Sequence, residues 1–379
     1  MSEMKVVKFD EFVRLGRGFD LPESQIIEGK YPVVASTNIK AYHHTYKVNP
    51  PVVVTGRSGS LGKVQFINEK CWPLNTSLYS KDFRDNNPKY IYYYLQIMHL
   101  EQYNAGAGVP TLNQNHLQKL KIKVPEKDEQ DELAKILSVY DNLIENNNKR
   151  IKVLEQMIEE LYKEWFVRLR FPNNEYYDHK DIIKYYKLHE LCSFSRGISY
   201  SSDEIDCEEG LDLINLKNIN AFGGFRRDGY KKYNGKYKNI HVVNTGDLVM
   251  GITDMTQNRR TVGSVALIPT TNNLSVISAD LVKINSNIDK LYLYCLFKYG
   301  EISKYISQFA NGSNVLHLRP DMIKNVLIPV AKEELIDKFV KIIRPLFKEV
   351  EFLYLKNDNL IKQRDLLLPR LMSGKLEVK

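Results

Sequence analysis

Hydrophobic residues recur at alternating steps of four and three along two long stretches of the chain. The first run leads from Leu133 to Trp165, and the second leads from Phe339 to Leu371. This spacing is the a/d seam of a coiled coil, sustained in each run over more than four heptads. Each position of the second run lies 206 residues after a position of the first, so the two seams share one register. The pattern predicts two long helices, the first roughly 50–60 Å long at about 1.5 Å per residue.

The sequence before each seam is also present twice. The segment Lys8–Gly18 returns as Lys187–Gly197, and both copies end in Arg-Gly. Buried-type strands are predicted at Val52–Val54 and Leu248–Met250, each shortly before a glycine. The offset between the copies grows early from about 179 to 201 residues and later to 206, and the first step indicates an insertion of about 22 residues in the second copy. Short aromatic helices are predicted later in the copies, at 88–103 and 289–309.

One asparagine lies in each seam, Asn147 in the first and Asn357 in the second. A buried asparagine at such a position fixes pairing geometry at some cost in stability. Since each helix follows one copy of the repeated domain, we expect the helices to pair antiparallel with each other. The alternative is that each helix packs separately on its own domain. Pro345 is predicted to kink or delay the second helix, and Pro369 to mark its end.

These patterns predict an α+β protein with a pseudo-twofold internal repeat, in which two long helices separate two tandem α/β domains and pair as an antiparallel coiled coil. At 379 residues, each copy is long enough to bury a core of its own. The predicted parts are a first domain at 1–125, a central helical region at 126–169, a polar linker at 170–180, a second domain at 181–330 and a C-terminal helical region at 331–379.

The formal net charge of +8 is unevenly distributed. Residues 1–125 contribute +6, residues 126–169 contribute −4, and residues 170–330 and 331–379 contribute +3 each. A basic N-terminal domain suits a polyanion such as DNA, although mildly basic proteins are common. The scattered cysteines form no C-x-x-C pair, and we find neither a signal peptide nor an apolar run of about 18 residues. We therefore expect a cytoplasmic protein with reduced thiols at Cys71, Cys192, Cys207 and Cys295.

Segments that imitate catalytic or metal-binding motifs fail on inspection. Gly56–Val64 resembles a phosphate-binding loop, but it has five residues between its glycines and Val64 where Ser or Thr would bind Mg²⁺. Asn49–Val52 lacks the aromatic residue and the glycine-rich loop of an amino-methyltransferase. His43-His44 has no spaced ligand partners and is interpreted as a surface loop. Pro320-Asp321 would need Glu377 and Lys379, at a terminus, to complete a nuclease pattern. We expect no catalytic residue, metal or cofactor in this chain.

Three local signatures carry a resemblance to a known family. The first is the apolar pattern at 117–125, followed by Glu129-Gln130. The second is Lys163–Phe166, and the third is Leu366–Leu371 with Ser373–Leu376 after it. With these motifs, the chain resembles over essentially its whole length the specificity subunit of Type I restriction–modification systems. The second copy departs from the first signature, because its glutamate is followed by a leucine, Leu335.

The resemblance implies a subunit without chemistry of its own. Two target-recognition domains, 1–125 and 181–330, would each read one half of a split target on double-stranded DNA. The helical regions would hold two methyltransferase subunits of a DNA adenine methylation system, and possibly motor–nuclease subunits as well. S-adenosylmethionine, and ATP with Mg²⁺ in a restricting complex, would belong to those partners. A stiff helical pair explains how the spacing of the half-sites is fixed, and a pseudo-twofold arrangement would offer similar surfaces to two identical partners.

Candidate DNA contacts are polar and basic residues in loops beside the matched strands, because Arg and Lys read guanine, Asn and Gln read adenine, and any cation binds phosphate. The alternative for each is a solvated loop residue. The candidates are Arg57, Ser58, Lys63, Thr111, Asn113 and Gln114 in the first copy, and Arg226, Arg227, Thr256, Gln257, Asn258, Arg259, Arg260, His317 and Arg319 in the second.

Two other classes of protein compete with this interpretation. A freestanding DNA-binding regulator with two recognition domains would need no large partner, so the outer faces of its helices should be polar. Ile136, Leu143, Met157 and Phe166 lie off the seam yet are apolar, which indicates burial against another protein. A pure coiled-coil scaffold would not explain two elaborate domains with divergent loops.

Overall fold

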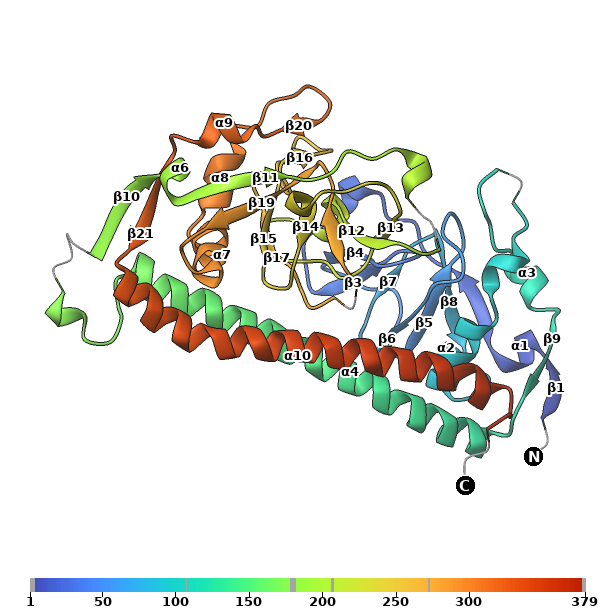
Figure 1. The fold of residues 1–379 in the computed structure, drawn as a ribbon. Helices are drawn as coiled ribbons and strands as arrows, with labels where there is room; N and C mark the ends of the chain where they lie inside the picture. The colour runs from blue at the N-terminus through green and yellow to red at the C-terminus, as the bar shows by residue number, and fades with distance from the viewer. Residues whose placement is uncertain (1–3, 107, 178–181, 206–207, 272, 377–379) are drawn as a thin grey trace. The chain divides into compact units, whose positions relative to one another are not determined.

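The computed structural model of the chain describes residues 4–106, 108–177, 182–205, 208–271 and 273–376 (Figure 1). It separates into two compact units. Unit 1 comprises Met1–Asn147 and Lys356–Lys379, and unit 2 comprises Asn148–Leu355. The predicted linker at 170–180 is described as far as residue 177, and its last three residues, together with Cys207, Glu377 and Lys379, lie outside the described residues.

The described residues of unit 1 form three small sheets. A four-stranded antiparallel sheet has β5 at its centre, and a three-stranded sheet combines one antiparallel and one parallel pair. The four-stranded sheet has the order β2 (Arg14–Arg17), β8 (Ser77–Asp82), β5 (Val52–Gly56), β6 (Val64–Ile67); the three-stranded sheet has β4 (Ile39–His43), β3 (Tyr31–Val34), β7 (Trp72–Pro73); and β1 (Lys5–Lys8) pairs antiparallel with β9 (Lys121–Val124).

Unit 2 repeats this plan with an additional short antiparallel strand pair. Its first sheet again has a four-stranded antiparallel order with the predicted strand inside, and its second again combines antiparallel and parallel pairs. The first sheet is β11 (Cys192–Arg196), β19 (Leu281–Ser286), β15 (Leu248–Gly251), β17 (Val265–Leu267); the second is β13 (Lys231–Tyr233), β12 (Leu211–Ile214), β18 (Ser275–Ile277), β14 (Val242–Val243); the pairs are β10 (Ile183–Lys187) with β21 (Leu327–Ala331), and β16 (Thr253–Asp254) with β20 (Leu316–His317).

The two predicted buried strands are confirmed. β5 and β15 are buried along their whole length, as apolar runs flanked by strands on both sides should be. The aromatic helices are also confirmed, but each breaks at a left-handed residue, His99 with φ 48° and Glu301 with φ 59°. Each begins at a side-chain cap, because Asn87 accepts hydrogen bonds from the backbone of α2 (Pro88–Ile97) and Asp289 does so for α7 (Lys290–Tyr299).

The remaining short helical segments lie between the strands. They are α1 (Phe9–Phe12), α3 (Gln114–Leu117), α6 (Leu188–Leu191), α8 (Ile302–Ser307), α9 (Pro320–Ile323), 3₁₀ turns at Glu23–Gln25, Leu100–Tyr103, Asn174–Tyr176, Ser202–Glu204, Leu216–Asn218 and Asn239–His241, and a π-helical turn at Lys163–Val167.

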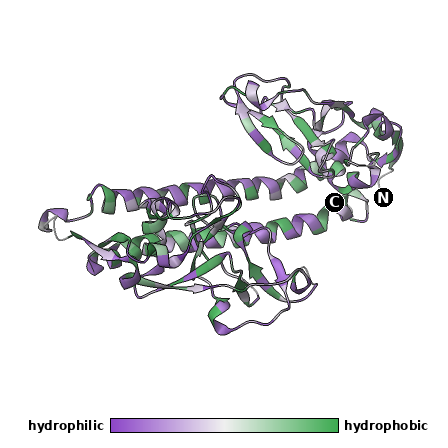
Figure 2. Ribbon diagram, turned by 90° about the horizontal axis from the view of Figure 1, so that it is seen from above, coloured by the Kyte–Doolittle hydropathy of each residue, from purple (hydrophilic) through white to green (hydrophobic). Residues whose placement is uncertain are grey.

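The long helices α4 (Lys127–Tyr162) and α10 (Glu333–Met372) follow the predicted seams. Every seam position is buried or half-buried, and Figure 2 shows hydrophobic and hydrophilic residues alternating along both helices. Within unit 1, Asn147 Nδ2 donates to Asn357 Oδ1 at 2.8 Å. Within unit 2, Trp165, just beyond α4, packs on Phe339 with ring centroids 5.7 Å apart. The helices therefore pair antiparallel, as predicted, and the alternative of separate packing is excluded.

Pro345 does not delay the second helix and Pro369 does not end it, so these two predictions were wrong. α10 begins before Pro345 and continues without interruption to Met372, three residues beyond Pro369. Pro345 is exposed, and so is Lys341, whose carbonyl loses its partner, so water can solvate that oxygen. Phe339 and Ile343, on either side of Lys341, are buried. They hold α10 against α4 and against the π-helical turn that follows α4.

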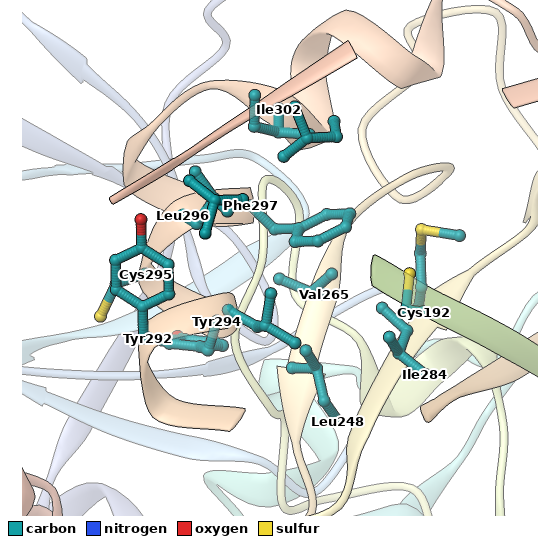
Figure 3. Packing of buried hydrophobic residues seen from close by; sticks show 14 of the residues in the cluster. Cys192, Leu248, Val265, Ile284, Tyr292, Tyr294, Cys295, Leu296, Phe297 and Ile302 are labelled. Atoms are coloured by element: carbon teal, nitrogen blue, oxygen red, sulfur yellow. The ribbon is translucent and has the colours of Figure 1, made fainter. Parts of the chain in front are cut away.

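Each four-stranded sheet packs on its aromatic helix. In unit 2, Leu248 of β15, Val265 of β17 and Ile284 of β19 face Leu296 and Phe297 of α7 (Figure 3). In unit 1, the equivalent cluster takes in α2, the start of α4 and the end of α10. Burial raises the pKa of the Cys192 thiol to about 12 in the first of these cores, so this cysteine is a protonated packing group.

Candidate nucleic-acid interface

Two predicted loop segments of unit 1 come together in the structure. Ser58 and Thr111 form an isolated antiparallel bridge, and the Leu112 N–H donates to the Arg57 carbonyl at 2.8 Å. The Gly59 N–H donates to the Pro110 carbonyl at 2.9 Å. The loop that follows β5 and the loop that precedes α3 therefore form one surface, although more than fifty residues separate them in sequence.

The side chains on this surface differ in what they can offer a ligand. Lys63 is exposed, whereas Arg57 is half-buried and its Nη1 donates to the Asn75 carbonyl at 3.2 Å. Asn113 caps α3, accepting from the Asn115 N–H at 2.9 Å. Thr111 Oγ1 donates to the Val109 carbonyl at 3.0 Å, and Gln114 Oε1 is buried with no partner among the described residues. Lys63 is the residue of this group best placed for a phosphate.

The equivalent loops of unit 2 also meet. β16 and β20 pair Thr253 with His317, and Gln257 Nε2 donates to the Ser313 carbonyl at 2.9 Å. The predicted residues 256–260 and 317–319 therefore share one end of the unit. Thr256, Gln257, Asn258 and Arg260 are exposed, as are His317 and Arg319.

A buried carboxylate shapes the first of these loops. Asp254 Oδ1 accepts from the Thr256 N–H and hydroxyl, both at 2.9 Å, and Oδ2 accepts from the Thr261 N–H at 2.8 Å. Burial opposes ionisation of Asp254, but the hydrogen bonds from Thr261 and Thr256 outweigh it and keep its pKa below the usual value. Arg259, with φ 53°, is held by its Nη1 donating to the Gln308 carbonyl at 3.1 Å. The loop therefore has a defined shape without a ligand.

A hollow of about 320 Å³ beside this loop adds a candidate contact that the sequence pattern did not single out. Arg196 lines it together with His317 and Arg319. Arg196 closes the Arg-Gly repeat, whose first copy ends in Arg17-Gly18. That repetition was the signal that could have identified it. Three basic or titratable side chains converging on one hollow suit a phosphate or a base edge.

One predicted contact is better explained by packing. The Arg227 guanidinium forms an ion pair with Glu351 of α10 and lies 4.6 Å from the Tyr354 ring centroid, with its side chain only 18% exposed. It joins the inserted segment to the helix, so packing explains this arginine, and its assignment as a DNA contact stays a prediction. Arg226 is exposed and lies 3.7 Å from Asp228.

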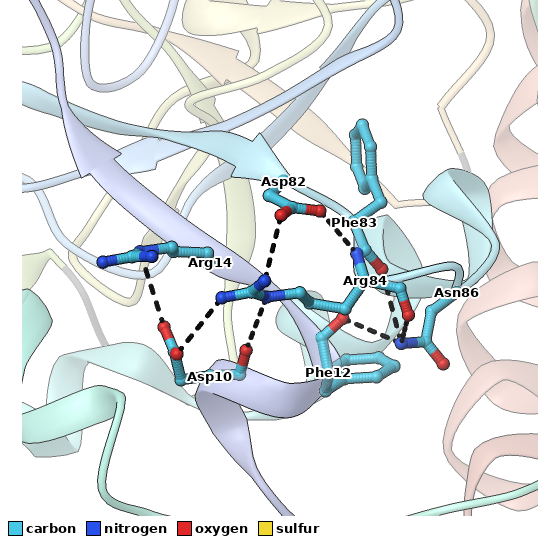
Figure 4. Close-up of polar contacts among 7 residues, drawn as sticks. All are labelled: Asp10, Phe12, Arg14, Asp82, Phe83, Arg84 and Asn86. Carbon is cyan, nitrogen blue, oxygen red and sulfur yellow. Dashed lines mark hydrogen bonds and ion pairs between the residues drawn. The ribbon is translucent and has the colours of Figure 1, made fainter.

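A separate ionic cluster in unit 1 is a structural joint. Arg84 contacts both Asp10 and Asp82, Arg14 lies 3.8 Å from Asp10, and Asn86 donates to three backbone carbonyls (Figure 4). The two aspartates balance the two arginines, so this cluster offers little positive potential to DNA. It fixes the turn at residues 83–86 against α1 and β2.

Gln130, part of the first family signature, connects this joint to α4. The side chain is 1% exposed; its Nε2 donates to Asn86 Oδ1 at 2.7 Å and to the Pro125 carbonyl at 3.0 Å, while its Oε1 accepts from the Asn87 N–H at 3.1 Å. In unit 2, buried Leu335 belongs to the apolar core instead. This hydrogen-bonded glutamine, which joins α4 to the turn at residues 83–86, is therefore specific to the first copy.

We predict that Gln130→Ala lowers the free energy of unfolding by about 1–3 kcal/mol, because it leaves buried polar groups without partners. Urea denaturation followed by circular dichroism measures this change. Glu132→Ala, at an exposed position of the same helix turn, is the matched control and should shift stability by less than about 0.5 kcal/mol. Equal stability of both variants would contradict the assigned role.

The motif at His43-His44 needs a correction. His43 ends β4, is 3% exposed and packs edge-on against Trp72 with ring centroids 5.2 Å apart, so it is a core residue and not part of a surface loop. Among the described residues, no group of three or more His, Cys, Asp or Glu side chains could hold a metal ion. Gly56–Val64 leads into strand β6, whereas a phosphate-binding loop leads into a helix. No helix of the described chain is both long and apolar enough to cross a membrane.

Comparison with known proteins finds a matching family model and relatives of this chain. Residues 1–156 match the model of the Type I restriction modification DNA specificity domain. The Type I restriction enzyme MjaIX specificity subunit of Methanocaldococcus jannaschii is 25% identical over 81% of this chain and 74% of its own length. The MjaVIII specificity subunit of the same organism is 22% identical over 100% of this chain and 94% of its own.

A solved structure agrees in fold. The crystal structure of a Type I restriction–modification system S subunit from M. genitalium superposes with a TM-score of 0.60 at 18% identity, covering 100% of this chain and 97% of that one. The curated relatives are named as specificity subunits of Type I restriction enzymes. Through the matched domain at residues 1–156 and these relatives, the chain is similar to the specificity subunits of Type I restriction–modification systems.

Proposed function

We propose that the chain reads a two-part DNA target, with one half-site recognised by each unit, and that it performs no chemistry itself. One observation supports this most strongly. In each unit, one loop follows the central strand of the four-stranded sheet, which is β5 or β15. A second loop, which precedes the short helix α3 or α9, lies against the first loop. The first loop spans residues 57–63 in unit 1 and 252–264 in unit 2. A shared scaffold with loops of different length and sequence suits two readers of different half-sites.

The helices are the proposed docking surface for two methyltransferase subunits. Val139 and Leu143 of α4 are 52% and 39% exposed, and Val153 and Met157, two heptads later, are 53% and 47% exposed. Equal heptad positions place each pair on the same face of the helix, so one apolar pattern is available twice. Phe352 and Leu366 of α10 are exposed as well.

Two of the four apolar residues that were predicted to contact a partner are packed inside this chain instead. Phe166 is 7% exposed, within the core of unit 2, and half-buried Ile136 packs against the core of unit 1. Leu143 and Met157 remain in the set. Exposed apolar pairs at one helix face still favour a chain with large partners over a freestanding regulator, whose outer helix faces should be polar.

The chemistry of the proposed complex would belong to its partners. The methyltransferase subunits would bind S-adenosylmethionine and methylate adenine, and motor–nuclease subunits, where present, would use ATP with Mg²⁺. This chain would supply the target sequence and the distance between its halves. Acting on genomic DNA, the complex would work in the cytoplasm.

Replacing residues 1–125 with the first domain of another family member is expected to change one half of the methylated motif and leave the other intact. The graft should keep Asn86, Asn87 and Tyr93, because these residues contact α4. The measurement is a genome-wide map of methylated bases in host cells carrying either gene, with a strain lacking the gene as control. A change in both halves together would overturn the two-reader proposal.

A further inference from the structure

The seam pairs its positions layer by layer. Asn147 faces Asn357, and in an antiparallel pair each step forward along α4 is a step back along α10. Eighteen residues forward from Asn147 is Trp165, and eighteen back from Asn357 is Phe339, which are indeed in contact. All ten seam positions of the first run therefore face seam positions of the second.

The internal repeat makes two of these layers equivalent in origin but unlike in chemistry. Moving 206 residues along the chain, Asn147 corresponds to Leu353, and Asn357 corresponds to Ile151. Ile151 and Leu353 face each other in the adjacent layer and are 4% and 1% exposed. One layer is thus a hydrogen-bonded asparagine pair, and its repeat-related counterpart is aliphatic.

This inequality matters when a helix meets a second copy of itself. Antiparallel pairing of α4 with another α4 in the same register would place Asn147 opposite Ile151 twice. Pairing of α10 with another α10 would place Asn357 opposite Leu353 twice. Each asparagine, 3% and 5% exposed in the present pairing, would then be buried without a partner, which is costly.

A second polar contact has the same consequence. Arg364 lies on the seam of α10 with its side chain 18% exposed, and its Nη1 lies 2.7 Å from Asp141 Oδ1. Tyr93 donates to the other oxygen of Asp141 at 2.5 Å, which fixes the carboxylate in place. In a pair of two α10 helices, Arg364 would face Leu346 and would have no Asp141 beside it.

We propose that these unequal layers make the two repeated halves of the chain select each other and reject a second copy of themselves. The seam fits one partner, the complementary half, because that pairing alone satisfies both asparagines and the half-buried arginine. The repeat by itself would allow three pairings of comparable shape. This inference rests on the helical seam alone and is independent of the proposed DNA target.

The test uses the whole chain with a protease site inserted between the exposed residues Pro172 and Asn173. The folded protein is cleaved, unfolded in urea, refolded, and weighed by native mass spectrometry. Four unpaired amides disfavour exchange into two homotypic dimers by about a thousandfold, so about a few per cent or less of each should form. Homotypic dimers at statistical abundance would overturn the proposal.

The decisive variant is Asn147→Leu/Asn357→Ile, which turns the polar layer into a copy of its aliphatic counterpart. Homotypic dimers are expected to increase at least tenfold, while circular dichroism shows the helices intact. The matched control, Asn146→Ala/Asp358→Ala, changes exposed neighbours and should leave pairing as in the parent chain. If the variant folds and shows no increase, the asparagine layer is not the selecting element and the proposal fails.

Discussion

Replacing Phe166 with alanine is expected to lower the free energy of unfolding by about 3–5 kcal/mol, a large share of the roughly 5–15 kcal/mol typical of a folded domain. The ring lies in the π-helical turn after α4 and packs on Phe339 and Tyr292, with ring centroids 4.9 Å and 5.2 Å apart. Removing it opens a cavity where the helical pair meets the core of unit 2.

Urea denaturation measures this loss, and Val167→Ala is the control. Val167 is the next residue but is 61% exposed, so its truncation should cost less than about 0.5 kcal/mol. The sequence pattern alone assigns Phe166 to a partner-binding surface. If that assignment were right, Phe166→Ala would leave stability unchanged and weaken only the association with a methyltransferase subunit. That result would contradict the structure.

The second large effect concerns the distance between half-sites. Inserting three heptads into both helices, between Lys149 and Arg150 and between Tyr354 and Leu355, keeps every seam layer facing its partner layer. At about 1.5 Å per residue, the insertion lengthens the helical pair by about 31 Å, close to one turn of B-DNA. The methylated motif should keep both half-sites and gain a spacer of about nine or ten base pairs.

A single heptad is the informative intermediate. It adds about 10 Å, or about three base pairs, and thereby turns one half-site by about a third of a turn around the duplex. We expect a longer spacer with weaker methylation than after three heptads. The same three heptads inserted after Pro172, outside the helices, should leave the motif unchanged. A genome-wide methylation map reads all three variants, and an unchanged spacer in the first would refute the helical pair as the ruler.

Periodicity predicted the helices well because one physical requirement governs the whole seam. Every a and d position must be buried, and the alternation of four and three steps records that requirement directly. The strands at Val52–Gly56 and Leu248–Gly251 were equally predictable from the sequence, because central strands are apolar along their length. The same register identified one buried-type asparagine in each seam, but only the structure shows that Asn147 and Asn357 face each other.

Individual side chains were less predictable because their surroundings come from distant segments. Arg227 was assigned to DNA by its charge, and only the fold brings Glu351 and Tyr354 to it. His43-His44 was assigned to a surface loop because no spaced ligand partners accompany it in sequence, whereas the fold packs His43 on Trp72. Pro345 could stay inside α10 because packing on both sides outweighs one lost hydrogen bond. The structure brings the candidate loops of each unit together, but whether these loops and their side chains touch DNA stays a prediction.

Unit 1 is built from two segments that lie far apart in the sequence, and this has a consequence for synthesis of the chain. Leu368, Leu371 and Met372 close a core whose other members end at Leu137. More than 200 residues must therefore be translated before that core can be sealed, a wait on the order of tens of seconds at about 5–20 residues per second. Unit 2 is continuous from Asn148 to Leu355 and faces no such wait. Unit 1 therefore leaves the ribosome first but completes its core last. A premature stop codon near the end of the gene would remove Leu368, Leu371 and Met372 and expose the core of unit 1.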